Sequence, residues 1–74
     1  MAIEETSVKI RVVTPGGTLI GVMTKAKNIR TLDALNLKSD FFALTEAKKE
    51  GDTQSRPGFM AVNRRQVMYV EEIS

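Results

Sequence analysis

The chain has no cysteine, no histidine and no tryptophan among its 74 residues. Without cysteine it can form neither a disulfide bond nor a catalytic thiolate. Without histidine it lacks the usual general base near neutral pH, and the commonest zinc ligands are missing as well. The remaining carboxylates have no recognisable base, nucleophile or metal partner in the sequence. We therefore predict a protein that is not an enzyme and has no catalytic residue, no metal site and no cofactor.

Long hydrophobic runs are also absent. The first seven residues, MAIEETS, carry two acids and resemble neither a secretory signal nor a transit peptide. No stretch approaches the roughly 20 apolar residues that cross a bilayer. These features predict a soluble, cytoplasmic protein that makes no membrane contact.

The short length predicts one small domain, residues 1–74, with a high ratio of surface to core. Domains of this size usually need a disulfide, a metal or an oligomeric contact for stability, and the first two are excluded. We therefore expect a homo-oligomer. Charge is distributed unevenly: all 11 basic residues lie within residues 6–70, whereas the acidic pairs Glu4-Glu5 and Glu71-Glu72 lie outside that range.

The first part of the chain predicts a β-hairpin. Ser7–Thr14 alternates apolar and charged residues, which is typical of a strand with one buried face. Pro15-Gly16-Gly17 predicts a tight turn, and Thr18–Thr24 predicts the returning strand. Gly21, in the middle of that strand, permits a bulge or sharp bend of the kind that curls a small sheet.

The middle of the chain predicts a loop, a short helix and a third strand. Lys25–Arg30 is polar and basic, and Thr31–Leu37 has a threonine that can cap a helix, with Leu32 and Leu35 positioned to pack on the sheet. Asp40–Ala47 then reads as a strand. It places Phe42 and Leu44 on one face and Phe41 and Ala43 on the other, so both faces are expected to find cover. Lys48–Gly58 is entirely polar and predicts a long loop.

The last part predicts two strands, Phe59–Val62 and Val67–Val70, separated by the polar corner Asn63-Arg64-Arg65-Gln66. With the earlier elements this gives a mainly β protein: a small five-stranded, bent or barrel-like antiparallel sheet of the SH3-like or Sm-like kind, with one short helix between strands two and three. We expect the last two strands to seal the sheet.

Both ends of the chain resemble Sm-like proteins. The hairpin VKIRVVTPGGTLIGVM, residues 8–23, is similar to their opening hairpin, and Phe59–Glu72 is similar to their closing pair of strands. The resemblance implies a five-stranded barrel, assembly into rings and RNA binding at the arginine-bearing corner. Nearly the whole chain also resembles small bacterial proteins of unknown function that contain "RTLDALN", "FFALTEA" and "FMAVNRRQVMYVEE", a likeness that implies no activity.

Two function classes remain open. In the first, the chain is a non-enzymatic interaction module that self-associates or binds protein through its strand edges, with residues 59–62 and 67–70 as the candidates for a shared sheet. In the second, a basic rim binds RNA or another nucleic acid, although exposed aromatic residues for base stacking are few. The residues of this rim would be Lys25, Lys27, Asn28, Arg30, Asn63, Arg64 and Arg65.

Overall fold

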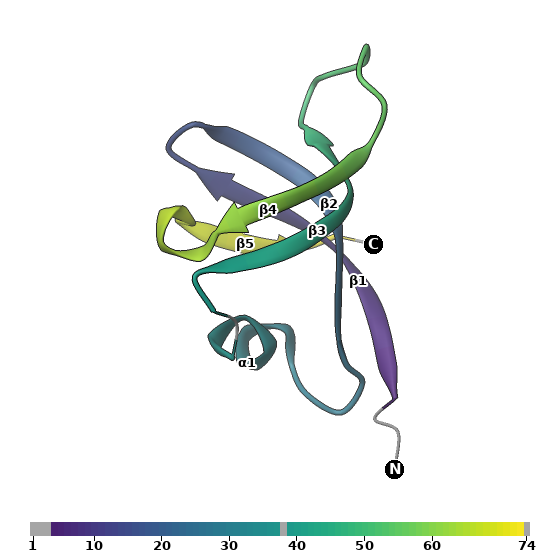
Figure 1. Cartoon of the computed structure of the whole chain (residues 1–74), viewed down its shortest axis with the longest axis vertical. Coiled ribbons are helices and arrows are strands. Elements are labelled where there is room, and N and C mark those ends of the chain that lie inside the picture. The colour runs from purple at the N-terminus through teal and green to yellow at the C-terminus, as the bar shows by residue number, and fades with distance from the viewer. Residues whose placement is uncertain (1–3, 38, 74) are drawn as a thin grey trace.

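A computed structural model describes residues 4–37 and 39–73, and Figure 1 shows a strongly bent sheet with one short helix lying to one side of it. The five strands are β1 (Glu5–Thr14), β2 (Gly17–Ala26), β3 (Phe41–Lys49), β4 (Gly58–Asn63) and β5 (Tyr69–Glu72). The helix α1 (Thr31–Asn36) lies between β2 and β3, and the 3₁₀ turn η1 (Arg64–Gln66) joins β4 to β5. The predicted fold class, a mainly β chain with one antiparallel five-stranded sheet and one helix, is confirmed.

The strands lie in the order β4-β3-β2-β1-β5, and every neighbouring pair is antiparallel. The last two strands are therefore the two edges of the sheet. The prediction that they seal it is wrong for the described residues, because β5 pairs with β1 and β4 pairs with β3, and the sheet is not closed. The short η1 turn carries the chain from one edge to the other, which the alternation of residues within each strand could not reveal.

The β1–β2 hairpin forms as the sequence predicts. Its register runs from Glu5 opposite Ala26 to Thr14 opposite Gly17, and Gly17 has φ +140°, which favours glycine. Ile10 and Val12 are fully buried on the inner face of β1, whereas the neighbouring charged residues Lys9 and Arg11 are not. The period of two therefore sets which face of the hairpin enters the core.

Two irregularities bend the sheet at the same place. The β2–β3 register shifts between Ile20 and Val22, on either side of Gly21, and the β3–β4 register shifts between Leu44 and Ala47. Within the second shift Glu46 has φ +50°, an uncommon conformation for a residue with a side chain. The predicted bend at Gly21 is confirmed, and β3 bends beside it.

The helix forms where predicted, but its end and its packing differ from the prediction. Arg30 is the N-cap and makes no side-chain cap bond, whereas Thr31 lies inside the helix with its hydroxyl buried and without a partner among the described residues. Leu35 packs against the core as expected. Leu32 is 62% exposed, so its predicted packing on the sheet is wrong, and the small side chain of Ala34 takes the buried position.

The core lies between the curled sheet and α1. Its largest fully buried side chains are those of Ile10, Val12, Met23 and Leu44. Phe42 is buried with them, but Phe41 on the opposite face of β3 is exposed, so only one face of β3 finds cover within the chain. No helix among the described residues is long and apolar enough to cross a membrane.

Candidate protein-interaction edges

The outer edge of β4 presents backbone groups that β3 does not use. The N–H of Arg64 donates to the carbonyl of Asp40 at 2.8 Å, in the register that places Val62 opposite Phe42. Because hydrogen-bonded and non-hydrogen-bonded pairs alternate along an antiparallel ladder, Val62 turns its backbone groups toward β3 and Ala61 turns its own away. The N–H and C=O of Ala61 therefore lie on the open edge.

Apolar side chains cover the outer face of the same two strands. Phe59 and Ala61 on β4 are exposed, and so are Phe41 and Ala43 on β3, with Ala43 directly opposite Ala61. Phe59 is 70% exposed, which is costly for an aromatic side chain that has no partner. An open strand edge beside exposed aromatic side chains is the usual form of a strand-pairing surface.

The outer edge of β5 is open in the same way. Ile73 donates its N–H to the carbonyl of Lys9 at 2.8 Å, in register with the β1–β5 pairing. The alternation then places the backbone groups of Glu71 and Tyr69 toward β1, and those of Val70 and Glu72 on the edge. Both ends of the sheet are thus able to accept a further strand.

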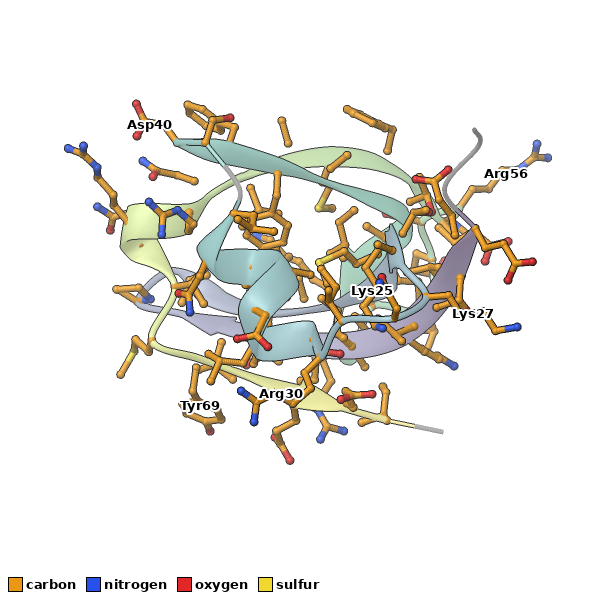
Figure 2. All side chains as sticks on the ribbon, turned by 90° about the horizontal axis from the view of Figure 1, so that it is seen from below. Lys25, Lys27, Arg30, Asp40, Arg56 and Tyr69 are labelled. Carbon is orange, nitrogen blue, oxygen red and sulfur yellow. The ribbon has the colours of Figure 1, made fainter. Side chains whose placement is uncertain are left out.

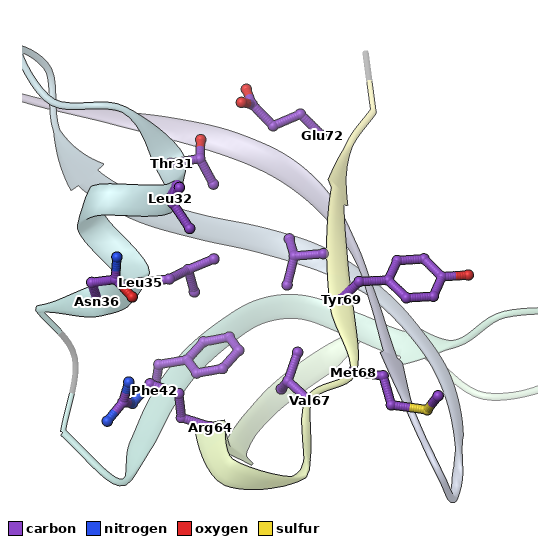
Figure 3. Close-up of a pocket in the computed structure, with 11 residues that line it drawn as sticks. Thr31, Leu32, Leu35, Asn36, Phe42, Arg64, Val67, Met68, Tyr69 and Glu72 are labelled. Atoms are coloured by element: carbon purple, nitrogen blue, oxygen red, sulfur yellow. The ribbon is translucent and has the colours of Figure 1, made fainter.

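A groove runs beside the edge of β5, between this strand and α1 (Figure 3). Its volume is about 650 Å³. The helix contributes Leu32 and Leu35 to its walls, and further apolar and aromatic side chains come from Phe42, Val67, Met68, Tyr69 and Val70. The groove leaves no pattern in the sequence, because its walls come from four separate segments and depend on the distance between α1 and β5.

The predicted polar corner is the η1 turn, and its side chains hold the turn in place. The Asn63 Oδ1 atom accepts a hydrogen bond from the Arg65 N–H at 3.0 Å, which caps η1. Arg64 Nε donates to the Ser39 carbonyl at 3.2 Å, and Arg65 Nε lies 3.5 Å from Asp40 Oδ1. Both arginines therefore tie η1 to the segment that precedes β3.

The other basic residues of the predicted rim also form hydrogen bonds or ion pairs with nearby groups. Lys25 Nζ donates to the carbonyls of Ala26 and Ile29, within its own turn. Lys27 Nζ lies 3.6 Å from Glu4 Oε2, and Arg30 Nε lies 3.1 Å from Asp33 Oδ2. Asn28 is exposed in the same turn.

The structure does not bring these basic residues onto one surface. Figure 2 shows Lys25 and Lys27 on one side of α1, with η1 on the other side and Arg30 between them. Because the helix separates the two groups, the expected rim is divided into small clusters. Most members of these clusters lie beside a carboxylate, which reduces the field that a phosphate backbone would meet.

Elsewhere on the sheet the charged groups form local ion pairs. Arg11 Nε lies 2.9 Å from Glu50 Oε2, and Arg11 Nη1 lies 3.4 Å from Glu71 Oε1. The hydrogen bond with Glu50 is the main reason that the pKa of the Arg11 guanidinium is raised. These contacts tie the start of the β3–β4 loop to β5. Among residues 4–37 and 39–73, no cluster of three or more acidic side chains is placed to hold a metal ion.

Comparison with known proteins adds no relative. No family model, no curated protein and no solved structure matches the chain.

Proposed function

We propose that this chain is a non-enzymatic interaction module that self-associates through the open edge of β4. The observation that carries the proposal is the strand order, which makes β4 an edge while its outer face exposes Phe59 and Ala61. Pairing of that edge would satisfy the outward backbone groups and remove an aromatic side chain from water. The domain is small and has neither a disulfide nor a histidine or cysteine metal site, so such burial would add to the stability of the folded chain.

Two copies related by a two-fold axis satisfy the β4 edge completely. With Ala61 at the axis, Phe59 of one copy lies opposite Asn63 of the second copy. Phe41 neighbours that asparagine on β3, so the two aromatic side chains lie on either side of Asn63 on the same face of the joined sheet. Only the small side chains of Ala43 and Ala61 lie beside the axis on this face of the joined sheet, so no bulky side chain obstructs the pairing of the two edges. The proposal is therefore a dimer with one sheet running through both copies.

The Sm-like resemblance supports a different assembly from the same edge. Because β4 and β5 are the two open edges of this sheet, β4 of one copy would pair with β5 of the next, and repetition of this head-to-tail contact would close a ring. The five-stranded sheet is compatible with it. The measured mass separates a dimer from a ring, and both require the β4 edge.

RNA binding is the alternative function. It rests on Arg64 and Arg65 at the η1 corner and on the basic turn at Lys25–Arg30. The local pairing of these side chains and their separation by α1 favour the protein-interaction proposal. Retention on a phosphate column that is lost at moderate salt, and lost in an Arg64→Ala, Arg65→Ala variant, would support the RNA proposal instead.

Light scattering on the purified chain tests the β4 edge. We expect twice the chain mass for the native sequence at micromolar concentration and the single-chain mass for Ala61→Pro. Proline removes the outward N–H of Ala61 without touching the β3 ladder, and its ring lies on the exposed face. Ala61→Ser keeps the N–H and is the matched control, which should remain dimeric. A native chain that is monomeric at that concentration overturns the proposal.

A further inference from the structure

The groove between α1 and β5 combines three features that a receptor for an extended peptide needs. It has an apolar lining, an open strand edge along one wall and charges of opposite sign at its two ends. The edge is formed by the backbone groups of Val70 and Glu72, as the β1–β5 register requires. A peptide lying in the groove could therefore pair its backbone with β5 and place alternate side chains against Leu35 and Phe42.

The charges give the groove a direction. Figure 3 shows Arg64 at the η1 end, beneath Phe42, and Glu72 at the other end of β5. Only the Nε of Arg64 has an assigned acceptor in the part of the chain that the structure describes, namely the Ser39 carbonyl, so its Nη atoms are available to an anion. Because β5 runs from the η1 end toward Glu72, an antiparallel strand would bring its C-terminal end to Arg64 and its N-terminal end to Glu72.

The η1 end of the groove favours a chain terminus over a continuous segment. In Figure 3 the turn from Arg64 to Val67 lies below the groove, at the end where the chain enters β5. A peptide that continued past this end of the groove would be obstructed by the turn. A segment that ended there would place its terminal carboxylate beside the Arg64 guanidinium, which donates to carboxylates in a planar, bidentate geometry.

We infer that the α1–β5 groove binds the free C-terminus of a partner protein, as an antiparallel strand added to β5. The recognised segment has apolar side chains at alternate positions, including the last, and a basic residue that reaches Glu72. This inference rests on the proposed function, since it gives β5, the second open edge of the same interaction module, the role of binding a peptide. It differs from the β4 contact in its surface, its partner and its chemistry.

The probe is the pentapeptide Lys-Thr-Val-Thr-Val, labelled with fluorescein at its N-terminus and followed by fluorescence anisotropy. Its valines alternate with threonines, so that both valines face the groove while the peptide stays soluble. We expect saturable binding to the native chain. Amidation of the C-terminus should weaken binding about tenfold, which corresponds to the loss of one charged contact. N-methylation of the central valine, which blocks pairing with Val70, should abolish binding.

Variants of the protein test the two walls of the groove. Arg64→Gln should weaken the binding of the free-acid peptide about tenfold and leave the affinity for the amidated peptide unchanged. Leu32→Glu should abolish binding of both, and it should fold normally because Leu32 is mostly exposed. Leu37→Glu is the matched control: Leu37 also lies at α1 and is 78% exposed, but it does not line the groove, so binding should be retained.

The same titration on Ala61→Pro separates this inference from the proposed function. We expect that variant to bind the peptide as the native chain does, whether or not the native chain is dimeric. Equal affinity for acid and amide, or the absence of saturation at millimolar peptide, overturns the inference and leaves the β4 contact untouched. A loss of dimer mass in Leu32→Glu would also overturn it, because it would assign the groove to a second copy of the chain.

Discussion

Gly21 lies directly beneath the side chain of Leu44. A Cβ atom built at Gly21 would stand 2.5 Å from Leu44 Cγ, closer than packed atoms approach, and 3.0 Å from the carbonyl oxygen of Thr45, which is a tight contact. Gly21 is also opposite Ile10 in the β1–β2 ladder. The missing side chain therefore makes the space that Leu44 occupies in the core, at the point where β2 and β3 bend together.

Gly21→Ala should accordingly destabilise the chain by about 1–3 kcal/mol, because the added methyl group overpacks the core where Leu44 is fully buried. Urea denaturation followed by circular dichroism measures the change. Gly58→Ala is the control, since nothing lies within 4 Å of a Cβ at that position, and it should be nearly neutral. A native-like stability for Gly21→Ala would contradict the packing described.

Thr31→Val should raise the stability. The Thr31 hydroxyl is buried without a hydrogen-bond partner in the described part of the chain, and a buried polar group left unsatisfied costs about 1–3 kcal/mol. Valine has nearly the same shape and removes that cost. Thr31→Ser keeps the hydroxyl and loses the methyl group, so it should be less stable than the native chain. If serine were tolerated and valine were not, the hydroxyl would have a partner in solution.

Asn63→Ala should cost about 1 kcal/mol of stability, because it removes the oxygen that caps η1 through the Arg65 N–H. Asn63→Asp retains a cap oxygen and should recover most of the loss. Thermal unfolding of the three proteins makes the comparison. A loss of equal size in both variants would show that the cap bond is not the cause.

Acid should release the loop at Asp52. The N–H groups of Ser55 and Gln54 donate to Asp52 Oδ1 at 3.0 and 2.9 Å and lower the pKa of this carboxyl below its ordinary value of 3.8. The folded pKa lies below the unfolded one, so the contribution to stability is present above pH 3.8 and is lost as the pH falls through the folded pKa. The amide shifts of Ser55 and Gln54 should titrate with a midpoint below 3.8. Asp52→Asn should abolish that titration, and a midpoint above 3.8 would contradict the contact.

The fold was largely predictable from the sequence because the alternation of apolar and charged residues identifies the strands and the position of glycine identifies a bend. Val8, Ile10 and Val12 identified the buried face of β1, and Gly21 identified the bend. The strand order was not predictable in the same way. Residues 59–62 and 67–70 look like partners across a short corner, but η1 takes the chain across the open side of the curled sheet, so each strand pairs with an earlier one.

The candidate sites were predicted less well, since they depend on which segments meet. Phe41 and Phe42 are adjacent residues of the same type, so the sequence does not show which of them is buried. The structure shows that Phe42 enters the core while Phe41 stays exposed. The number of basic residues in the sequence left open whether they share one surface, and the structure places the lysines of the turn at Lys25–Arg30 across α1 from η1. The apolar runs at residues 59–62 and 67–70 made both strands candidates for a shared sheet, and the strand order places both at an edge, whereas the α1–β5 groove left no local signal.

Amide hydrogen exchange at Ala61 and Val62 tests the central claim most directly, because the two neighbouring N–H groups point to opposite sides of β4. We predict that Val62 is protected at every protein concentration, since it pairs with β3. Ala61 should exchange rapidly in dilute solution and become protected as the concentration rises and the edge pairs with a second copy. An Ala61 amide that exchanges equally fast at low and high concentration would contradict association through this edge.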